Sequence, residues 1–401
     1  MLSAIRKSYT HTIYASYLGY ITQAIVNNFA PLLFITFIGE FDLKMEMITL
    51  ITTVNFAVQL AVDAIAAKVV DRIGYRPCIV AAHVFAAAGL AGLAVFPAIL
   101  PPFAGIMTAV VLYAVGGGIL EVLVSPIVEA CPSERKAAAM SLLHSFYCWG
   151  HVFLVVVSTA FFAVCGIANW RVLACLWALV PLLNVFYFLL VPLAPVVQEG
   201  TKQLTLRELF RSKVFWVLMV MMVCAGASEQ AMSQWASAFA EKGLGVSKTL
   251  GDLAGPCAFA ILMGAARALY GKFEAKIPLR TFMAASCGLC IGCYLLAALS
   301  GNALLALVGC AMCGFSVGIF WPGTFSTGAA ALPGGGTAMF ALMALGGDVG
   351  CSAGPTVVGL VSGALGGSLQ SGLLVALAFP MVMLAFTLLM RPEKASLQGP
   401  A

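Results

Sequence analysis

Charged side chains are scarce in this chain. Asp, Glu, Lys and Arg together make up 9% of its 401 residues, whereas a water-soluble domain carries roughly 25%. Hydrophobic residues make up 62%, and the mean hydropathy is +1.02. The charges fall in clusters separated by apolar runs of roughly 20 to 28 residues, which are long enough to cross a bilayer as tilted helices. The composition therefore excludes a soluble domain and indicates an integral membrane protein.

Two other absences narrow the class. The apolar runs are too long for the alternating strands of a membrane barrel, so we expect an all-α membrane protein. A cleavable signal peptide is also missing, because the apolar run after Arg6 and Lys7 is too long for a signal core and no small-residue cleavage site follows it. We expect the first helix to stay in the membrane.

The features that suggest metal or nucleotide sites are incomplete. The thirteen cysteines include the pairs Cys287/Cys290 and Cys310/Cys313, a spacing that suggests zinc in a soluble chain, but no acid or His lies near them. We interpret these cysteines as small buried hydrophobic residues. The Gly-rich stretch 332–336 follows no strand and lacks the lysine of a phosphate-binding loop. We therefore expect neither a metal nor a cofactor.

A fixed central cation is missing as well. Lys68 and Arg267 lie at predicted helix ends, and no Lys or Arg falls near the middle of a span. Carriers of phosphates or carboxylates usually need such a cation to hold the substrate. We therefore do not expect an anionic solute. We also expect no nucleic acid as a partner.

The apolar runs predict about twelve membrane-spanning helices. Their expected ranges are 10–38, 45–70, 78–98, 103–131, 137–165, 169–193, 213–241, 247–270, 279–299, 303–331, 335–363 and 369–391. The longest polar segment, 194–212, separates six spans from six. We therefore divide the chain into a six-helix bundle at 1–193, a cytoplasmic linker at 194–212 and a second six-helix bundle at 213–401.

The distribution of basic residues predicts the orientation. With the amino terminus in the cytoplasm, 17 of the 21 Lys and Arg residues fall on the cytoplasmic side, as the positive-inside rule requires. The four remaining ones are Lys44, Arg171, Lys242 and Lys248. An odd number of spans would remove this asymmetry. We expect a multi-pass protein of the cytoplasmic (cell inner) membrane with both termini cytoplasmic.

The two halves echo each other at a shift of about 200 residues. The segment Gly118-Ile119-Leu120-Glu121 corresponds to Gly318-Ile319-Phe320-Trp321, and Pro126 lies near the counterpart of Pro322. Two parallel six-helix repeats with a site between them near the membrane midplane are typical of secondary transporters of the major facilitator type.

The junction after the second span carries a motif of that type. The sequence Asp71-Arg72-Ile73-Gly74-Tyr75-Arg76-Pro77 resembles the major facilitator loop signature G-x-x-x-D-R-x-G-R-R, although Ala67 and Pro77 depart from it. The resemblance implies a gating loop on the cytoplasmic ends of helices 4 and 11. We expect Glu129 to pair with Arg72 or Arg76, and we place Asp348 towards the same side. The alternative is a solvated turn with surface ion pairs.

Helices 4, 5 and 7 resemble the fucose and hexose proton symporter branch of this superfamily. The resemblance rests on three motifs: Leu120-Glu121 with Pro126, His144-Ser145-Phe146-Tyr147 followed by Gly150, and Gly226-x-x-Glu229 followed by Trp235. Two departures are Ser125 in place of Asn and, on helix 1, Gln23, Asn27 and Asn28 in place of an aspartate. The resemblance implies proton-coupled sugar uptake, with Glu121 carrying more of the proton chemistry.

Acids inside a membrane are costly and face a bundle interior or water. Asp63 and Asp348 are expected nearer the cytoplasmic side, and Glu121 and Glu229 near the middle of helices 4 and 7. Since a low dielectric favours the protonated form of a carboxyl group, we expect Glu121 to carry the proton, with Glu229 and His144 as further candidates. The alternative for each is a structural hydrogen bond between helices.

Amide and aromatic side chains recur on the faces of helices 1, 2, 5 and 7. Amides bond hydroxyl groups and rings cover the apolar face of a sugar, so these residues predict a binding surface for a neutral polyhydroxylated solute. Its expected members are Gln23, Asn27, Asn28, Asn55, Gln59, Tyr147, Trp149, His151, Gln230, Gln234, Trp235 and Trp321.

The sequence thus predicts a monomeric transporter that works by alternating access, couples to protons and takes up a neutral sugar or similar polar solute from across the lipid bilayer. The first alternative is drug efflux by proton antiport, because a cavity with acids and aromatic rings also accepts lipophilic cations. The second is a membrane enzyme or a receptor on a transport fold, which the repeat and the absence of a nucleophile beside His144 argue against. We therefore expect no enzymatic activity.

Overall fold

The structure, a computed structural model, describes residues 5–132, 136–194, 204–273, 277–332 and 336–390. Throughout these ranges the chain forms helices and short connections, without strands. Twelve helical segments of the described chain are long and apolar enough to cross a membrane, as the sequence predicts. The all-α expectation is confirmed.

Several spans are interrupted helices. In chain order the elements are α2 (Tyr9–Asn28), η1 (Ala30–Leu33), α3 (Phe34–Phe41), α4 (Met45–Ile73), α5 (Tyr75–Ile99), α6 (Pro102–Ala130), α7 (Lys136–Cys165), η2 (Ile167–Asn169), α8 (Trp170–Leu190), α9 (Leu206–Arg211), α10 (Lys213–Ser233), α11 (Ala236–Ala238), η3 (Phe239–Gly243), α12 (Lys248–Asp252), η4 (Leu253–Cys257), α13 (Ala258–Phe273), α14 (Leu279–Leu299), α15 (Ala303–Val317), α16 (Phe320–Ala331), α17 (Gly336–Ala364), α18 (Leu369–Ala376) and α19 (Ala378–Leu389). Pro31 explains the first interruption, because it lacks the N–H that a continuing helix would need.

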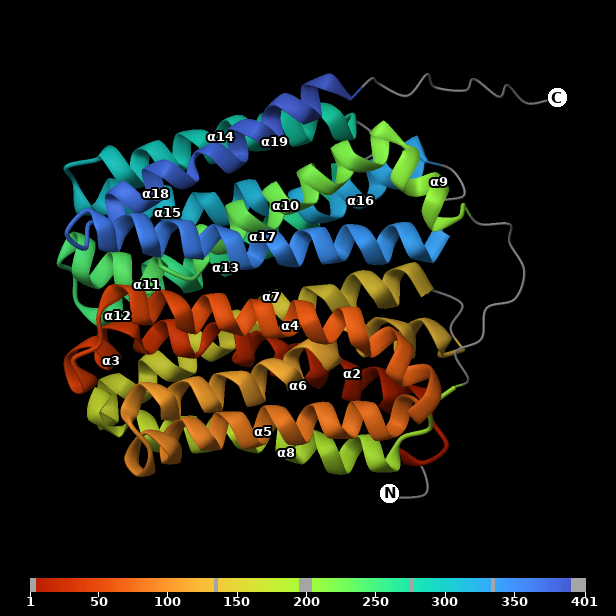
Figure 1. Cartoon of the computed structure of the whole chain (residues 1–401), viewed down its shortest axis with the longest axis horizontal. Helices are drawn as coiled ribbons and strands as arrows, with labels where there is room; N and C mark the ends of the chain where they lie inside the picture. Colours follow the sequence, from red (N-terminus) through yellow and green to blue (C-terminus); the bar gives the residue numbers. More distant parts are fainter. Residues whose placement is uncertain (1–4, 133–135, 195–203, 274–276, 333–335, 391–401) are drawn as a thin grey trace.

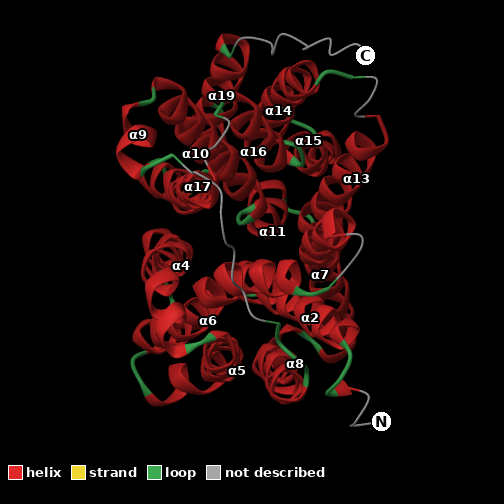
Figure 2. Ribbon diagram, turned by 90° about the vertical axis from the view of Figure 1, so that its right-hand side faces the viewer, coloured by secondary structure: helices red, strands yellow, loops and turns green. Residues whose placement is uncertain are grey.

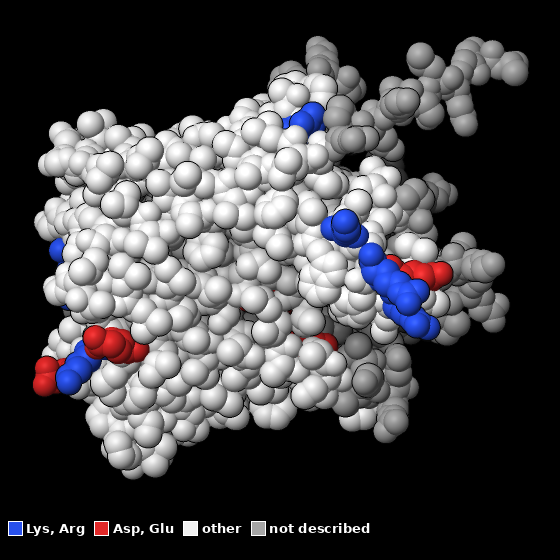
Figure 3. Space-filling model, turned by 45° about the horizontal axis from the view of Figure 1, so that its top comes forward, with Lys and Arg blue, Asp and Glu red and all other residues white. Residues whose placement is uncertain are grey.

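The helices form two groups that lie side by side (Figure 1). Viewed along the helices, α2 and α4 to α8 form one group and α10 to α19 the other, with α4 facing α17 and α7 facing α13 (Figure 2). We call the end of the bundle where α2 begins and α19 ends the inner end, because the basic residues predict that it is cytoplasmic, and the opposite end the outer end. On the face seen in Figure 3, charged side chains gather at the two ends, and apart from small red areas the band between them is white.

Two arginines at equivalent places secure the inner ends of the two groups. Arg76 at the start of α5 donates to the carbonyl oxygens of Phe188 and Val191 at 2.6 and 2.8 Å. Arg280 at the start of α14 donates to Thr387 and Leu388 at the end of α19. In both halves a guanidinium satisfies carbonyl groups that a helix end leaves unpaired. The two arginines are 204 positions apart, in keeping with the repeat.

This contact gives one residue of the gating motif a partner. Arg76 binds the end of α8, whose carbonyl groups lie within its reach. Gly74 ends α4 with a φ of 95°, a backbone conformation that only glycine adopts without strain. The side chains of Asp71, Arg72 and Glu129 lie outside the described residues, so their role in gating stays a prediction.

Glycines bring α17 unusually close to α10. A Cβ atom added at Gly350 would lie 2.0 Å from the carbonyl oxygen of Val223, and one at Gly354 would lie 2.4 Å from that of Ala227. From the other side, a Cβ at Gly226 would lie 2.2 Å from the carbonyl oxygen of Gly347. The Gly-rich sequence of the eleventh span therefore serves helix contact, because small residues let membrane helices approach closely.

We predict that Gly350→Ala lowers the thermal unfolding midpoint of the purified protein. The added methyl group has to displace backbone, at a cost of about 1–3 kcal/mol. The matched control is Gly288→Ala on α14, where a Cβ would meet nothing within 4 Å, so the substitution is neutral or adds up to about 1 kcal/mol through helix propensity. Equal midpoints for the two variants would contradict the packing account.

Candidate functional site

Three carboxyl groups from three helices converge between the two groups of helices. Asp63 on α4, Glu121 on α6 and Asp348 on α17 place one carboxylate oxygen each within 4.8 Å of the others. Asp63 and Glu121 belong to the first half and Asp348 to the second. We call these residues the carboxyl cluster.

The helix register explains the convergence. Asp63 lies ten residues before the end of α4 at Ile73, Glu121 nine before the end of α6 at Ala130, and Asp348 twelve after the start of α17 at Gly336. All three helix ends are at the inner end, and at 1.5 Å per residue these offsets differ by less than about 5 Å. The expectation that depth separates Glu121 from Asp63 and Asp348 is therefore wrong.

The cluster carries more negative charge than its surroundings balance. One carboxylate oxygen of Asp63 is buried without a hydrogen-bond partner among the described residues, and an Asp348 carboxylate oxygen lies within 4.8 Å of an Asp63 one. Two charged carboxylates 4.8 Å apart repel by about 3 kcal/mol at an effective dielectric constant of 20. A proton shared between them removes this repulsion. Three carboxylate oxygens are also donors that suit a hard metal cation.

Gln23 connects the cluster to a network of amides. Its Nε2 donates to Glu121 at 3.2 Å and to Gln59 at 2.9 Å. The Gln59 amide in turn donates to Asn27 at 2.7 Å and to Asn55 at 3.1 Å. The predicted amides of helices 1 and 2 are thus brought together, and in this conformation they bond to one another.

The network continues into the second half. Gln234, the residue directly after α10, donates to the backbone carbonyl of Asn27 at 3.0 Å and to Gln230 at 3.1 Å. Asn28 reaches the hydroxyl of Tyr147 on α7 at 3.3 Å. A hydrogen-bonded chain of buried polar groups therefore runs from Glu121 across the boundary between the halves.

One cationic side chain, that of Arg267, reaches the interior between the helices. Arg267 on α13 places its guanidinium 4.0 Å from Glu229, and it also donates to the sulfur of Cys148 at 3.4 Å and to the carbonyl of Gly318 at 3.2 Å. The break between α15 and α16 leaves that carbonyl free to accept. The expectation of no central cation is wrong, because a long side chain carries its charge well away from its backbone position.

The aromatic candidates separate into three groups. Tyr147 and Trp321 are half-buried in the interior, the latter packed against Gly347. Trp235 is 1% exposed and donates to the carbonyl of Pro355 at 2.9 Å, so it holds α10 to α17. Trp149 is 52% exposed.

The assignment of Trp149 to the binding surface is a mistake of helix register. Trp149 shares an exposed apolar face of α7 with Leu142, Phe153 and Val156. Residues two apart on a helix do not face the same way, so Trp149 points away from Tyr147.

The two predicted histidines of α7 lie in different surroundings. His151 is 2% exposed. His144 is exposed, and its ring centroid lies 5.2 Å from that of Tyr20, whose hydroxyl bonds the Ser125 hydroxyl at 3.0 Å. Tyr20 and Arg267 are the contacts that sequence reasoning missed. One feature of the sequence could have indicated that Arg267 reaches the interior: it lies six residues before the end of α13, at Phe273.

The chain is similar to known proteins in both sequence and structure. Residues 16–355 match the family model described as Major Facilitator Superfamily. No curated protein matches the sequence. Among solved structures, a bacterial homolog of the human lysosomal transporter Spinster, in an inward-facing and occupied conformation, has a TM-score of 0.78 at 15% identity over 95% of this chain and 96% of that one.

The structures of two sugar symporters are also similar to that of this chain. The D-xylose-proton symporter has a TM-score of 0.75 at 14% identity over 95% of this chain and 97% of that chain. The E. coli fucose:proton symporter FucP has a TM-score of 0.65 at 16% identity over 96% and 99%. At such identities these likenesses establish the fold.

We predict that Arg267 and Glu229 are energetically coupled. Arg267→Gln leaves the Glu229 carboxylate without its counter-charge and lowers the free energy of unfolding by about 1–3 kcal/mol, less than for a fully buried pair because both side chains keep some exposure. Adding Glu229→Gln removes the stranded charge and restores part of the loss. A double-mutant cycle on unfolding in detergent measures the coupling, and losses that add within about 0.5 kcal/mol would contradict it.

Proposed function

This chain belongs to the Major Facilitator Superfamily, and we propose that it is a proton-coupled secondary transporter that takes up a small neutral polar solute, such as a sugar, by alternating access. We propose a monomer in the cell inner membrane with both termini in the cytoplasm. The observation that carries the proposal is the carboxyl cluster, in which acids of both halves meet.

The cluster couples protonation to the approach of the two halves. When Asp63 and Asp348 are both ionised, their repulsion disfavours contact between α4 and α17 at this depth. A proton taken up there, with Glu121 as its neighbour, allows the contact to form. Proton occupancy therefore shifts the equilibrium between conformations by its differential affinity for them.

The surrounding groups favour a neutral solute. The charge of Arg267 is balanced by Glu229 at 4.0 Å, so the pair adds no net charge to the interior. The amides of Gln23, Asn28 and Gln230 can exchange their bonds to protein groups for bonds to hydroxyl groups. Tyr147, whose hydroxyl accepts from Asn28 at 3.3 Å, adds an aromatic face beside them, and Trp321 adds another next to Gly347.

Two structural neighbours agree with this substrate class, since one is a fucose:proton symporter and the other a D-xylose-proton symporter. Another neighbour is the nucleoside transporter NupG, with a TM-score of 0.74 at 13% identity. The choice of a neutral polar solute therefore rests on the interior groups of this chain.

The second candidate function is efflux of lipophilic cations by proton antiport. It is supported by the excess of negative charge, because the cluster contributes three carboxyl groups while the charge of Arg267 is already balanced by Glu229. Transport by the purified protein in vesicles under an imposed pH gradient distinguishes the two. Sugar accumulation driven by an acidic exterior supports symport, and export of a cation in exchange for protons supports efflux.

We predict that Glu121→Gln abolishes accumulation against a gradient, lowering it at least about tenfold, and preserves equilibrative exchange. The amide keeps the bond with Gln23 but cannot bind and release a proton. Asp348→Asn is expected to act in the same way. The matched control is Glu208→Gln on α9, an exposed carboxyl whose bond to the backbone N–H of Thr205 lowers its pKa.

Three outcomes would oppose this function. They are pH-driven accumulation that survives Glu121→Gln, equal losses in Glu208→Gln, and accumulation driven by a sodium gradient without a pH gradient. The last result would assign the carboxyl cluster to a metal cation instead.

A further inference from the structure

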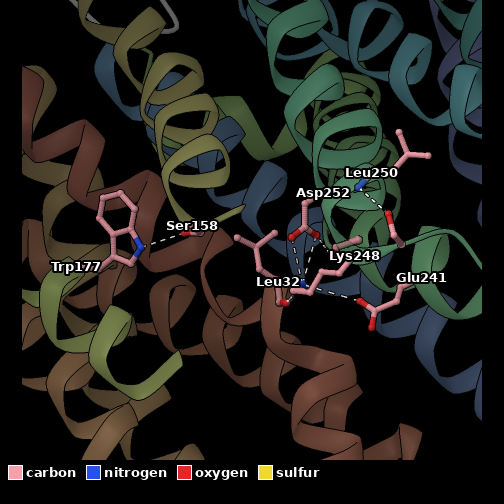
Figure 4. A network of polar contacts seen from close by, with 9 residues as sticks. Leu32, Ser158, Trp177, Glu241, Lys248, Leu250 and Asp252 are labelled. Carbon is pink, nitrogen blue, oxygen red and sulfur yellow. Dashed lines mark hydrogen bonds and ion pairs between the residues drawn. The ribbon is translucent and has the colours of Figure 1, made fainter. Parts of the chain in front are cut away.

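Lys248 joins the two halves at the outer end. It lies on α12 in the second half, and its Nζ donates to the backbone carbonyl of Leu32 in the first half at 2.5 Å (Figure 4). The ring of Phe162, on α7 of the first half, lies 5.6 Å from the same nitrogen, and an aromatic face at that distance attracts a cation. One ammonium group of the second half therefore makes two contacts with the first half.

The interrupted first span supplies the acceptor. Leu32 lies in η1, and the regular helix resumes as α3 at Phe34. A break of this kind leaves carbonyl groups without a partner in the helix, and a buried carbonyl group needs a donor from elsewhere. Leu32 is 3% exposed, so the bond from Lys248 meets that need.

Groups of the second half hold the ammonium group in place. The Asp252 carboxylate, about one helical turn after Lys248, lies 3.2 Å from its Nζ. Asp252 is buried and also accepts a hydrogen bond from the Ser237 hydroxyl at 2.5 Å, which fixes its position. Glu241 is farther away, with its Oε2 at 4.0 Å from the ammonium nitrogen. Because a buried cation needs a counter-charge, Asp252 balances the charge of Lys248 where it reaches across to the first half.

Helices α4 and α17 close the same end of the molecule. A Cβ atom added at Gly359 near the end of α17 would lie 2.0 Å from Oγ1 of Thr49, and one at Gly363 would lie 2.8 Å from Oε1 of Glu46. Thr49 and Glu46 lie near the start of α4. The halves are therefore in close contact at the outer end, and alternating access has to separate them there.

Such an opening would break one bond of Lys248 and keep another. The bond to Leu32 crosses between the halves, whereas Asp252 is on the same helix as Lys248 and moves with it. A hydrogen bond from a charged group is worth more than one between neutral groups, and the Lys248 side chain is only 19% exposed. Its loss corresponds to a shift of roughly ten- to a hundredfold in the ratio of open to closed molecules.

We propose that Lys248 is a latch that holds the outer end closed through the Leu32 carbonyl, with Asp252 as its positioning residue. This inference rests on the proposed transport function, because a latch has a role only if the outer end opens. It gives a reason for one of the four basic residues that the sequence places on the outer side, where such residues are few.

Distances between the halves test the latch. Spin labels on Leu100→Cys in the first half and Leu299→Cys in the second occupy exposed positions at the outer end, in a background that carries Cys165→Ser and Cys175→Ser at the exposed cysteines. Double electron–electron resonance in detergent then measures the share of molecules with an open outer end. We expect Lys248→Met, which keeps the length of the side chain without its ammonium group, to raise the ratio of open to closed molecules at least about tenfold.

The matched control is Lys242→Met, an exposed lysine of η3 in the same half and at the same end, which should leave the ratio unchanged. The double variant Lys248→Met/Asp252→Asn removes the carboxylate charge that the single substitution leaves unpaired, and it should show the same increase. Unchanged distances in both Lys248 variants, or an equal increase in Lys242→Met, would overturn the latch. An increase that the double variant abolishes would also overturn it, because the effect would then come from the stranded Asp252 charge.

The distance measurement needs neither a solute nor a pH gradient, so failure of the latch differs from failure of the transport function. The first is an unchanged ratio in the Lys248 variants while the wild-type protein accumulates solute under a pH gradient. The second is the absence of pH-driven accumulation by the wild-type protein, whatever the distances.

Discussion

A carboxylate inside a membrane needs a proton, a cation or hydrogen-bond donors, and this constraint shapes the interior of the protein. Glu229 meets it with the guanidinium of Arg267. Among the described residues no cation lies within reach of Asp63, Glu121 or Asp348. Glu121 accepts a hydrogen bond from the neutral amide of Gln23. Their proximity favours a bound proton or cation, and because they belong to both halves, this requirement underlies the proposed coupling between protonation and the relative position of the halves.

The rest of the fold is consistent with the proposed coupling. Within each half, arginines bonded to helix ends and glycines packed on backbone hold the helices closely together. Contacts between the halves include side-chain hydrogen bonds, such as those of Gln234 with Asn27 and of Thr53 with Thr356. In the proposed alternating access such bonds can be exchanged for others, whereas close backbone packing resists rearrangement.

Much of this architecture could be predicted from the sequence. Spans of sufficient length and the repeat at about 200 residues were enough for the fold, since the bilayer allows few alternatives. The amides that the sequence places on helices 1, 2 and 7 lie together in the structure, and their role in binding a solute stays a prediction. The failures share one cause, which is the use of chain position alone. Arg267 was judged by where its backbone lies, and Trp149 by its proximity in sequence to Tyr147 rather than by the helical period.

The sequence by itself determined that the chain crosses the membrane about twelve times, with polar groups facing an interior. It did so because hydropathy and helical periodicity act locally along the chain. Only the tertiary structure decided that Asp348 meets Asp63 and Glu121, that Arg267 meets Glu229, and that Lys248 lies between Leu32 and Asp252. Most of these contacts depend on how separate helices, within one half or across the two, are placed side by side, and distances between such helices are fixed by packing rather than by local sequence.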